Sequence, residues 1–129
     1  RIGLIRSCRT GCVEPGAMKG QCHCGAVQIT VPGPPAEISR CNCSLCRTTG
    51  WIGGYWHPDE VMVAAPPGAL NSYVQGDRMI TTWNCASCGS HTHWTPRTAS
   101  PDRMGVNMRI FEPEEWQHLP VRVVDGASF

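Results

Sequence analysis

Seven of the nine cysteines fall into three tight clusters, and this grouping constrains the fold more than any other feature of the chain. The clusters are Cys22-His23-Cys24, then Cys41-Asn42-Cys43-Ser44-Leu45-Cys46, then Cys85-Ala86-Ser87-Cys88. Zinc in proteins is usually tetrahedral, so two ions need eight ligand positions, and these clusters supply seven. The simplest partition joins the two outer pairs into a closed four-thiolate site and leaves the central triplet with a second ion and one open position.

A disulfide-bonded secreted module explains this spacing less well than metal binding does. Nine cysteines cannot pair completely, and Cys-x-Cys neighbours cannot easily bridge each other. The sequence has no apolar run as long as a membrane span and no signal-peptide pattern. With 129 residues, we expect one domain in a reducing, cytoplasmic compartment and no membrane partner.

The charge balance argues against nucleic acid as the partner. The chain has a formal net charge of +1, and residues 18–129 carry eight Lys or Arg against nine Asp or Glu, a net of −1. Zinc modules that bind nucleic acid usually do so through a basic face. We therefore expect no nucleic-acid partner.

Residues 1–17 differ in composition from the rest. They contain three arginines and scattered glycines without a strand or helix period, and Met18-Lys19-Gly20 follows as a plausible natural start. Cys8 and Cys12 lie in this stretch without a partner pair nearby. We expect 1–17 to be a flexible or non-native extension, and 18–129 to be the working domain.

Short apolar runs separated by frequent turn residues favour an all-β fold. The expected strands are 26–31, 61–63, 70–75, 79–83, 104–110 and 121–124, with one helical turn at 113–116. Strands 70–75 and 79–83 flank Gly76-Asp77 and are expected to form a hairpin.

The outer cysteine pairs are suited to a structural site. In an extended segment, residues i and i+2 point to the same side, so Cys22 and Cys24 can reach one ion. Cys85 and Cys88 have the spacing of a zinc knuckle, and Gly89 allows a tight turn. Four thiolates from distant parts of the chain would contribute folding free energy directly.

The central cluster is suited to an open site. Cys41, Cys43 and Cys46 can converge as a tripod, and three protein ligands with one exchangeable position are typical of catalytic zinc. Two alternatives remain: a histidine among His23, His91 and His93 could close the site, or another chain could supply a ligand.

Charge indicates what the open position would bind. Three thiolates around Zn²⁺ leave a formal charge of −1, which weakens the ion as a Lewis acid for water. A small thiol, bound as thiolate, is the expected guest. Arg40 and Arg47 flank the tripod. They could bind a carboxylate of this thiol, or they could be solvated side chains on the surface. Trp51, Tyr55 and Trp56 could wall a pocket or belong to the core.

These motifs together resemble the glutathione-dependent formaldehyde-activating enzyme family. The resemblance covers residues 18–129 and is carried by Gly20-Gln21-Cys22-His23-Cys24-Gly25-Ala26-Val27, Cys41-Asn42-Cys43-Ser44-Leu45-Cys46-Arg47, Cys85-Ala86-Ser87-Cys88-Gly89-Ser90 and the closing Val124-Asp125-Gly126. Three cysteine motifs in this order and spacing are jointly specific.

The resemblance implies an all-β, Mss4-like or β-tent fold of several small coiled antiparallel sheets with two zinc ions. It implies structural ligands at Cys22, Cys24, Cys85 and Cys88, and ligands of a catalytic zinc at Cys41, Cys43 and Cys46. It also implies a carbon-sulfur lyase acting on glutathione and formaldehyde, with S-hydroxymethylglutathione as the adduct. We expect the thiolate to attack the aldehyde while an unidentified donor protonates the alkoxide.

Two other classes of function fit the same cysteines. Both metals could be structural in an interaction module or thiol carrier without catalysis, or the tripod could be a redox sensor that forms disulfides and releases zinc. Replacing Cys43 separates the first of these from an enzyme, because only in a structural site should its loss unfold the domain.

Overall fold

The computed structural model describes residues 16–74, 76, 78–97 and 102–128, and these form two β-sheets with little helix. The smaller sheet has three strands in the order β1 (Met18–Gln21), β2 (Gln28–Val31) and β5 (Met62–Ala64). The larger sheet has seven, in the order β10 (Val121–Val124), β3 (Ile38–Cys41), β4 (Gly53–Trp56), β9 (Met104–Asn107), β8 (His91–Pro96), β7 (Ile80–Cys85) and β6 (Leu70–Val74). The expected all-β class is confirmed.

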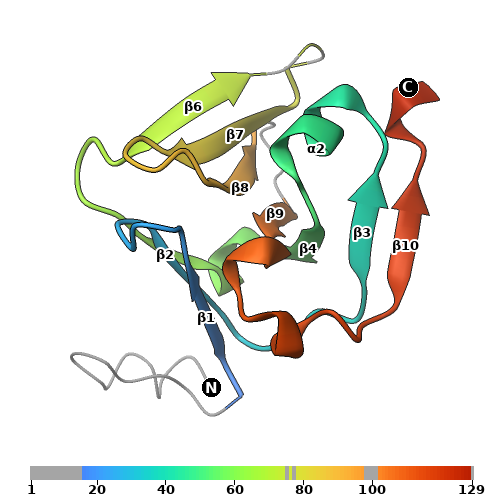
Figure 1. The fold of residues 1–129 in the computed structure, drawn as a ribbon, viewed down its shortest axis with the longest axis horizontal. Helices are drawn as coiled ribbons and strands as arrows, with labels where there is room; N and C mark the ends of the chain where they lie inside the picture. Colours follow the sequence, from blue (N-terminus) through green and yellow to red (C-terminus); the bar gives the residue numbers. More distant parts are fainter. Residues whose placement is uncertain (1–15, 75, 77, 98–101, 129) are drawn as a thin grey trace.

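The larger sheet is strongly coiled, and a short helix lies between its two arms. In Figure 1, β6 and β7 lie on one side of helix α2 (Ser44–Thr49), and β3 and β10 lie on the other. Four single turns of 3-10 helix complete the described elements: Pro58–Glu60, Met108–Ile110, Pro113–Glu115 and Gly126–Ser128. No helix in the described part of the chain is long and apolar enough to cross a membrane.

One strand pair departs from the antiparallel pattern. Strand β10 runs parallel to β3, with Val121 opposite Ile38 and Val124 opposite Cys41. Every other described pair is antiparallel. The parallel pairing carries the C-terminal segment past Cys41, which becomes important for the site.

The core lies where the two sheets face each other. Strand β2 alternates in burial, so Ile29 and Val31 are buried while Gln28 and Thr30 are only partly covered. From the larger sheet, Val106 and the following Met108 complete this core and are fully buried. The period-two pattern that predicted β2 thus reflects one face packed on apolar side chains.

The predicted strand over 104–110 is correct only for its first half. Strand β9 ends at Asn107, and residues 108–110 turn into a 3-10 helix. The buried Asn107 side chain accepts hydrogen bonds from Arg109 N at 3.2 Å and Ile52 N at 3.3 Å, and it donates to His91 O at 2.8 Å. An asparagine that satisfies nearby backbone groups in this way competes with the strand ladder and ends it.

The other local predictions agree with the structure. The hairpin is formed by β6 and β7, the helical turn by Pro113–Glu115, and the last strand by β10. Part of the predicted hairpin, Gln75 and Asp77, lies outside the described residues, as do 1–15 with Cys8 and Cys12. Helix α2 was not predicted, because six residues are too few to show a helical period.

Candidate functional site

The two outer cysteine pairs come together as one group, the four-cysteine cluster. Cys22 and Cys24 follow β1, Cys85 ends β7, and Cys88 lies in the turn to β8. Their four sulfurs all lie within 4.8 Å of one another, with Cys22 Sγ 3.7 Å from Cys24 Sγ and Cys24 Sγ 3.5 Å from Cys85 Sγ. A tetrahedral ion with metal–sulfur bonds of about 2.3 Å needs sulfurs roughly 3.8 Å apart. The cluster could therefore hold a metal ion.

Each cysteine pair is held by a tight loop that points backbone N–H groups at sulfur. Val27 N donates to Cys22 Sγ at 3.3 Å, and Cys88 N donates to Cys85 Sγ at 3.4 Å. Gly25 and Gly89 close these loops with φ angles of +83° and +80°, a conformation that favours glycine. N–H donors aimed at sulfur favour the thiolate over the thiol, as a metal ligand requires.

Ser90 supports the same cluster and was not predicted. Its hydroxyl lies 3.3 Å from Cys88 Sγ, and it accepts a hydrogen bond from His23 N at 3.3 Å. Hydrogen bonds from the Ser90 side chain and backbone lower the pKa of Cys88 to about 5. The Ser90 contacts therefore favour the thiolate form of Cys88. The Gly89-Ser90 pair directly after Cys88 is the sequence feature that could have indicated this supporting role.

The central cysteines form a second group, the three-cysteine cluster. Cys41 ends β3, Cys43 caps α2, and Cys46 lies in the first turn of α2, with all three sulfurs within 4.8 Å of one another. Cys43 Sγ accepts a hydrogen bond from Cys46 N at 3.4 Å, which is the helix-capping contact. This cluster could also hold a metal ion.

No histidine completes the three-cysteine cluster in the part of the chain that the structure describes. Neither an imidazole nitrogen of His23, His91 or His93 nor a carboxylate joins the three sulfurs within 4.8 Å. His93 is buried, and its Nδ1 lies 2.8 Å from the Thr92 hydroxyl. Burial, together with the neighbouring His91, lowers the pKa of His93 to about 4, so this ring is neutral. The geometry thus supports the open alternative.

Ionisation of one thiol in this cluster opposes ionisation of its neighbours. Burial and the neighbouring Cys43 and Cys41 raise the pKa of Cys46. Burial also opposes ionisation of Cys43, but hydrogen bonds from the backbone and side chain of Cys46 outweigh it and lower the Cys43 pKa. One thiolate is therefore favoured at the expense of its neighbours, and a bound metal would be needed to hold three.

The C-terminal segment is fastened to the three-cysteine cluster through Asn42. Asn42 Nδ2 donates to Asp125 Oδ1 at 2.8 Å, and Asn42 Oδ1 accepts from Ala127 N at 2.9 Å. Asp125 in turn accepts from the Ser128 hydroxyl at 2.7 Å, and these hydrogen bonds lower the Asp125 pKa. The sequence did not indicate that the chain end supports the site, because Asn42 and Asp125 are 83 positions apart.

Gly126 is the point where this segment touches the sulfur ligands. A Cβ placed on Gly126 would fall on Cys41 Sγ and come within 3.3 Å of Cys43 Cβ. We therefore expect Gly126→Ala to weaken metal binding at the three-cysteine cluster by about ten- to a hundredfold, the range seen when groups supporting a metal ligand are displaced.

Titration with Co²⁺, whose absorption reports binding to thiolates, would measure this effect on protein whose three-cysteine cluster alone has been freed of metal. The four-cysteine cluster should retain its metal, and Ala127→Gly, a small change in the same segment, should leave both sites intact. Equal affinities of Gly126→Ala and wild type at the three-cysteine cluster would contradict the packing described.

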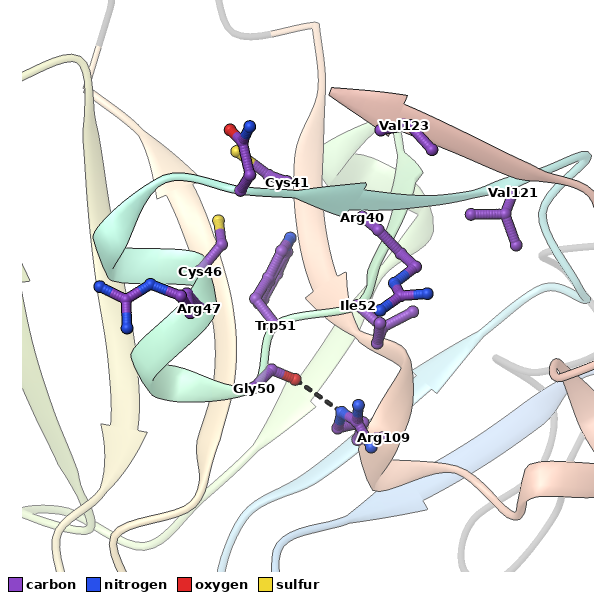
Figure 2. A pocket seen from close by; sticks show the side chains of 11 residues that line it. Arg40, Cys41, Cys46, Arg47, Gly50, Trp51, Ile52, Arg109, Val121 and Val123 are labelled. Atoms are coloured by element: carbon purple, nitrogen blue, oxygen red, sulfur yellow. Dashed lines mark hydrogen bonds between the residues drawn. The ribbon is translucent and has the colours of Figure 1, made fainter. Parts of the chain in front are cut away.

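One side of the three-cysteine cluster opens into a pocket of about 570 Å³ that carries three arginines. Figure 2 shows Arg47 on the α2 side of Trp51 and Arg40 and Arg109 on the other side, with Arg109 Nε donating to Gly50 O at 2.7 Å. None of the described residues that line this cationic pocket is acidic. The predicted Arg40 and Arg47 thus share a pocket with the sulfurs, and Arg109 joins them unpredicted.

The other side opens into a second pocket, of about 480 Å³, with aromatic walls. Cys41, Cys43 and Cys46 all line this aromatic pocket, and none of its described lining residues is charged. Its other lining residues include Leu45, Trp51, Tyr55, Ile80, His91 and Trp94. Of the three aromatic residues noted in the sequence, Trp51 and Tyr55 wall this pocket and Trp56 belongs to the buried core.

Comparison with known proteins places these features in a family context. The sequence model of a family described as "Glutathione-dependent formaldehyde-activating enzyme" matches residues 17–121, which include both cysteine clusters. A Halomonas elongata protein named for the same family is 51% identical over 39 residues, which are 30% of this chain and only 25% of that protein. A solved Rhodobacter sphaeroides structure has a TM-score of 0.66 and 34% identity, and the match covers 81% of this chain and 100% of the other.

Proposed function

The chain belongs to the glutathione-dependent formaldehyde-activating enzyme family, and on this premise we propose that it is a zinc-dependent carbon-sulfur lyase-type enzyme. It binds a small thiol, glutathione or a close analogue, at the three-cysteine cluster, and it forms or cleaves an S-hydroxymethyl-type adduct with formaldehyde. The observation that carries the proposal is a set of three converging thiols with no fourth described ligand, bordered by two pockets.

We propose two zinc ions per chain, because all-thiolate sets in tetrahedral spacing favour zinc among the common divalent ions. The four-cysteine cluster is the structural site, and Cys41, Cys43 and Cys46 hold the catalytic ion. When bound there, zinc supplies a fourth position at which a thiol is stabilised as its thiolate. The free cysteines of the described chain are consistent with a reducing, cytoplasmic location.

The arginines orient the thiol. Glutathione carries carboxylates at both ends, and a guanidinium can bind a carboxylate through two parallel hydrogen bonds. Arg47 and, on the other side of Trp51, Arg40 and Arg109 offer such contacts within the pocket that Cys41 and Cys46 also line (Figure 2). Fixing the peptide's ends in this pocket would place its sulfur at the cysteine cluster and convert an encounter between two molecules into a positioned reaction.

The proposed reaction balances without an oxidant or reductant. The thiol gives up its proton on binding, and its sulfur attacks the carbonyl carbon of formaldehyde. A carbon–sulfur bond forms, the π pair of the carbonyl moves to oxygen, and the oxygen takes up one proton. The product is the hydroxymethyl adduct, and cleavage is the same sequence in reverse.

Calorimetric titration of the zinc-loaded protein with glutathione and with S-methylglutathione tests this function. We expect two zinc ions per chain and saturable glutathione binding, with a heat that depends on the buffer because the thiol releases a proton. S-methylglutathione keeps both carboxylates but cannot form a thiolate, so it should bind at least about tenfold more weakly. Two zinc ions with no binding of any small thiol would contradict the proposal and favour an interaction module.

A further inference from the structure

The two pockets meet at the three-cysteine cluster but differ in chemistry. Cys41, Cys46 and Trp51 line both, whereas Cys43 lines the aromatic pocket alone. All charged side chains among the described lining residues are on the cationic side. A reacting sulfur at the cluster is therefore bordered by a charged cavity and by an uncharged one.

This difference assigns the two reactants to different sides. Carboxylates placed in the aromatic pocket would lose their hydration without gaining a cationic partner, which is unfavourable. The three arginines of the cationic pocket supply such partners. With the anionic thiol on the cationic side, the aromatic pocket remains for the second reactant.

The aromatic pocket is much larger than formaldehyde. Its volume is about 480 Å³, which is within the range of roughly 300–1,000 Å³ typical of small-molecule sites. Formaldehyde has two non-hydrogen atoms and would occupy little more than a water molecule, whose share of liquid volume is about 30 Å³. Trp51, Tyr55 and Trp94 would then remain in contact with water, although aromatic walls are most favourable against an apolar group.

His91 adds to the aromatic lining of this pocket. His91 lines the aromatic pocket, and its ring centroid lies 5.0 Å from that of Trp51. Both ring nitrogens are buried without a hydrogen-bond partner among the described residues. Because these nitrogens have almost no accessible surface, His91 contributes ring surface and no exposed polar atom to this pocket.

We infer that the acceptor used by this chain is an aldehyde with an apolar, ring-sized substituent, which lies in the aromatic pocket while the thiol's carboxylates lie in the cationic pocket. The inference rests on the proposed function and extends its substrate class beyond formaldehyde. The thiolate sulfur bonds to the aldehyde carbon, the carbonyl π pair moves to oxygen, and that oxygen takes a proton to give a hemithioacetal.

Binding of stable thioethers tests the pocket without catalysis. S-benzylglutathione and S-methylglutathione share both carboxylates and differ by one ring, so calorimetry of the zinc-loaded chain compares the pocket's affinity for that ring. We expect S-benzylglutathione to bind about tenfold more tightly, a modest share of what burying an aromatic ring can contribute. Equal affinities would overturn the inference.

A matched pair of variants identifies which pocket is responsible. Ile80 is half-buried and lines the aromatic pocket, so Ile80→Trp fills it and should abolish the preference for the benzyl group. Val63→Trp adds the same side chain at an exposed position on β5, away from both pockets, and should leave the preference unchanged. Should Ile80→Trp fail to fold, Ile80→Ala, which enlarges the cavity, should still change the ratio of the two affinities. An affinity ratio that stays at the wild-type value in a folded Ile80 variant would overturn the inference.

Turnover separates this inference from the proposed function. With glutathione, we expect kcat/KM for phenylacetaldehyde to exceed that for formaldehyde by about tenfold, and we expect Ile80→Trp to remove this advantage while Val63→Trp retains it. Glutathione binding with turnover of formaldehyde alone would overturn the inference and leave the proposed function standing. No glutathione binding at all would overturn both.

Discussion

Replacing Cys88 with serine is expected to abolish the cooperative unfolding transition of the domain at 25 °C. The four-cysteine cluster joins the loop after β1 to the turn between β7 and β8, so one ion would fasten both sheets. Structural zinc contributes apparent binding free energies of about 10–16 kcal/mol in small zinc domains. A domain of this size has a total stability of only about 5–15 kcal/mol, so loss of this site should leave it unfolded.

Circular dichroism and tryptophan fluorescence during thermal and urea unfolding would measure this change. Ser87→Ala is the matched control, because Ser87 is an exposed neighbour in the same turn and not a member of the cluster. The control should unfold cooperatively, like wild type. A Cys88→Ser protein that keeps the wild-type transition would show that this cluster does not hold the fold together.

The cysteine clusters were predictable because most of their geometry is local. Cys41, Cys43 and Cys46 are brought together by six consecutive residues, and the capping of α2 by Cys43 needs only the next turn of helix. The joining of Cys22 and Cys24 with Cys85 and Cys88 followed from ligand counting, since neither pair can complete a tetrahedron alone. The spacing of the cysteines thus predicts contacts between distant segments, which the periodicity of apolar residues does not predict.

The supporting contacts were not predictable, because they join residues that are distant in sequence. Arg109 reaches Gly50 O across 59 positions, and Asn42 binds Asp125 across 83. Both depend on strand order: β9 lies beside β4, and β10 pairs in parallel with β3. A single sequence contains no local signal for such pairings. The cationic pocket and the contact of Gly126 with Cys41 could therefore be identified only from the tertiary structure.

Strand β9, which ends at Asn107 although the sequence predicts a strand to residue 110, also shows that local patterns do not contain tertiary contacts. The alternation of Met104 to Ile110 is compatible with one long strand, and local preference alone gives no reason to stop at Asn107. The strand ends there because Asn107 bonds to Ile52 N and His91 O, which only the assembled sheet brings near. Tertiary hydrogen bonds outweighed the local pattern.

Replacing Cys43 with serine should have the opposite outcome to Cys88→Ser: the fold persists and thiol binding is lost. Cys43 caps α2 by accepting a hydrogen bond from Cys46 N, and serine is a favourable residue at this capping position. The helix should therefore remain, with a stability change of less than about 1 kcal/mol. A serine oxygen is a poor substitute for a soft thiolate ligand, so the three-cysteine cluster should lose its metal.

Zinc content, unfolding and glutathione calorimetry on one preparation would test this prediction. Zinc should fall from two ions per chain to one, and glutathione affinity should decrease by at least about a hundredfold, since removing one metal ligand abolishes the site that would receive the thiol. Ser44→Ala, beside Cys43 but outside the cluster, should retain both ions and normal binding.

Cys43→Ala adds the loss of the helix cap, so it should be less stable than Cys43→Ser by about 1 kcal/mol while binding glutathione no better. Unfolding of Cys43→Ser comparable to that of Cys88→Ser would instead mean that both clusters are structural, because an open site can lose its metal without loss of the fold.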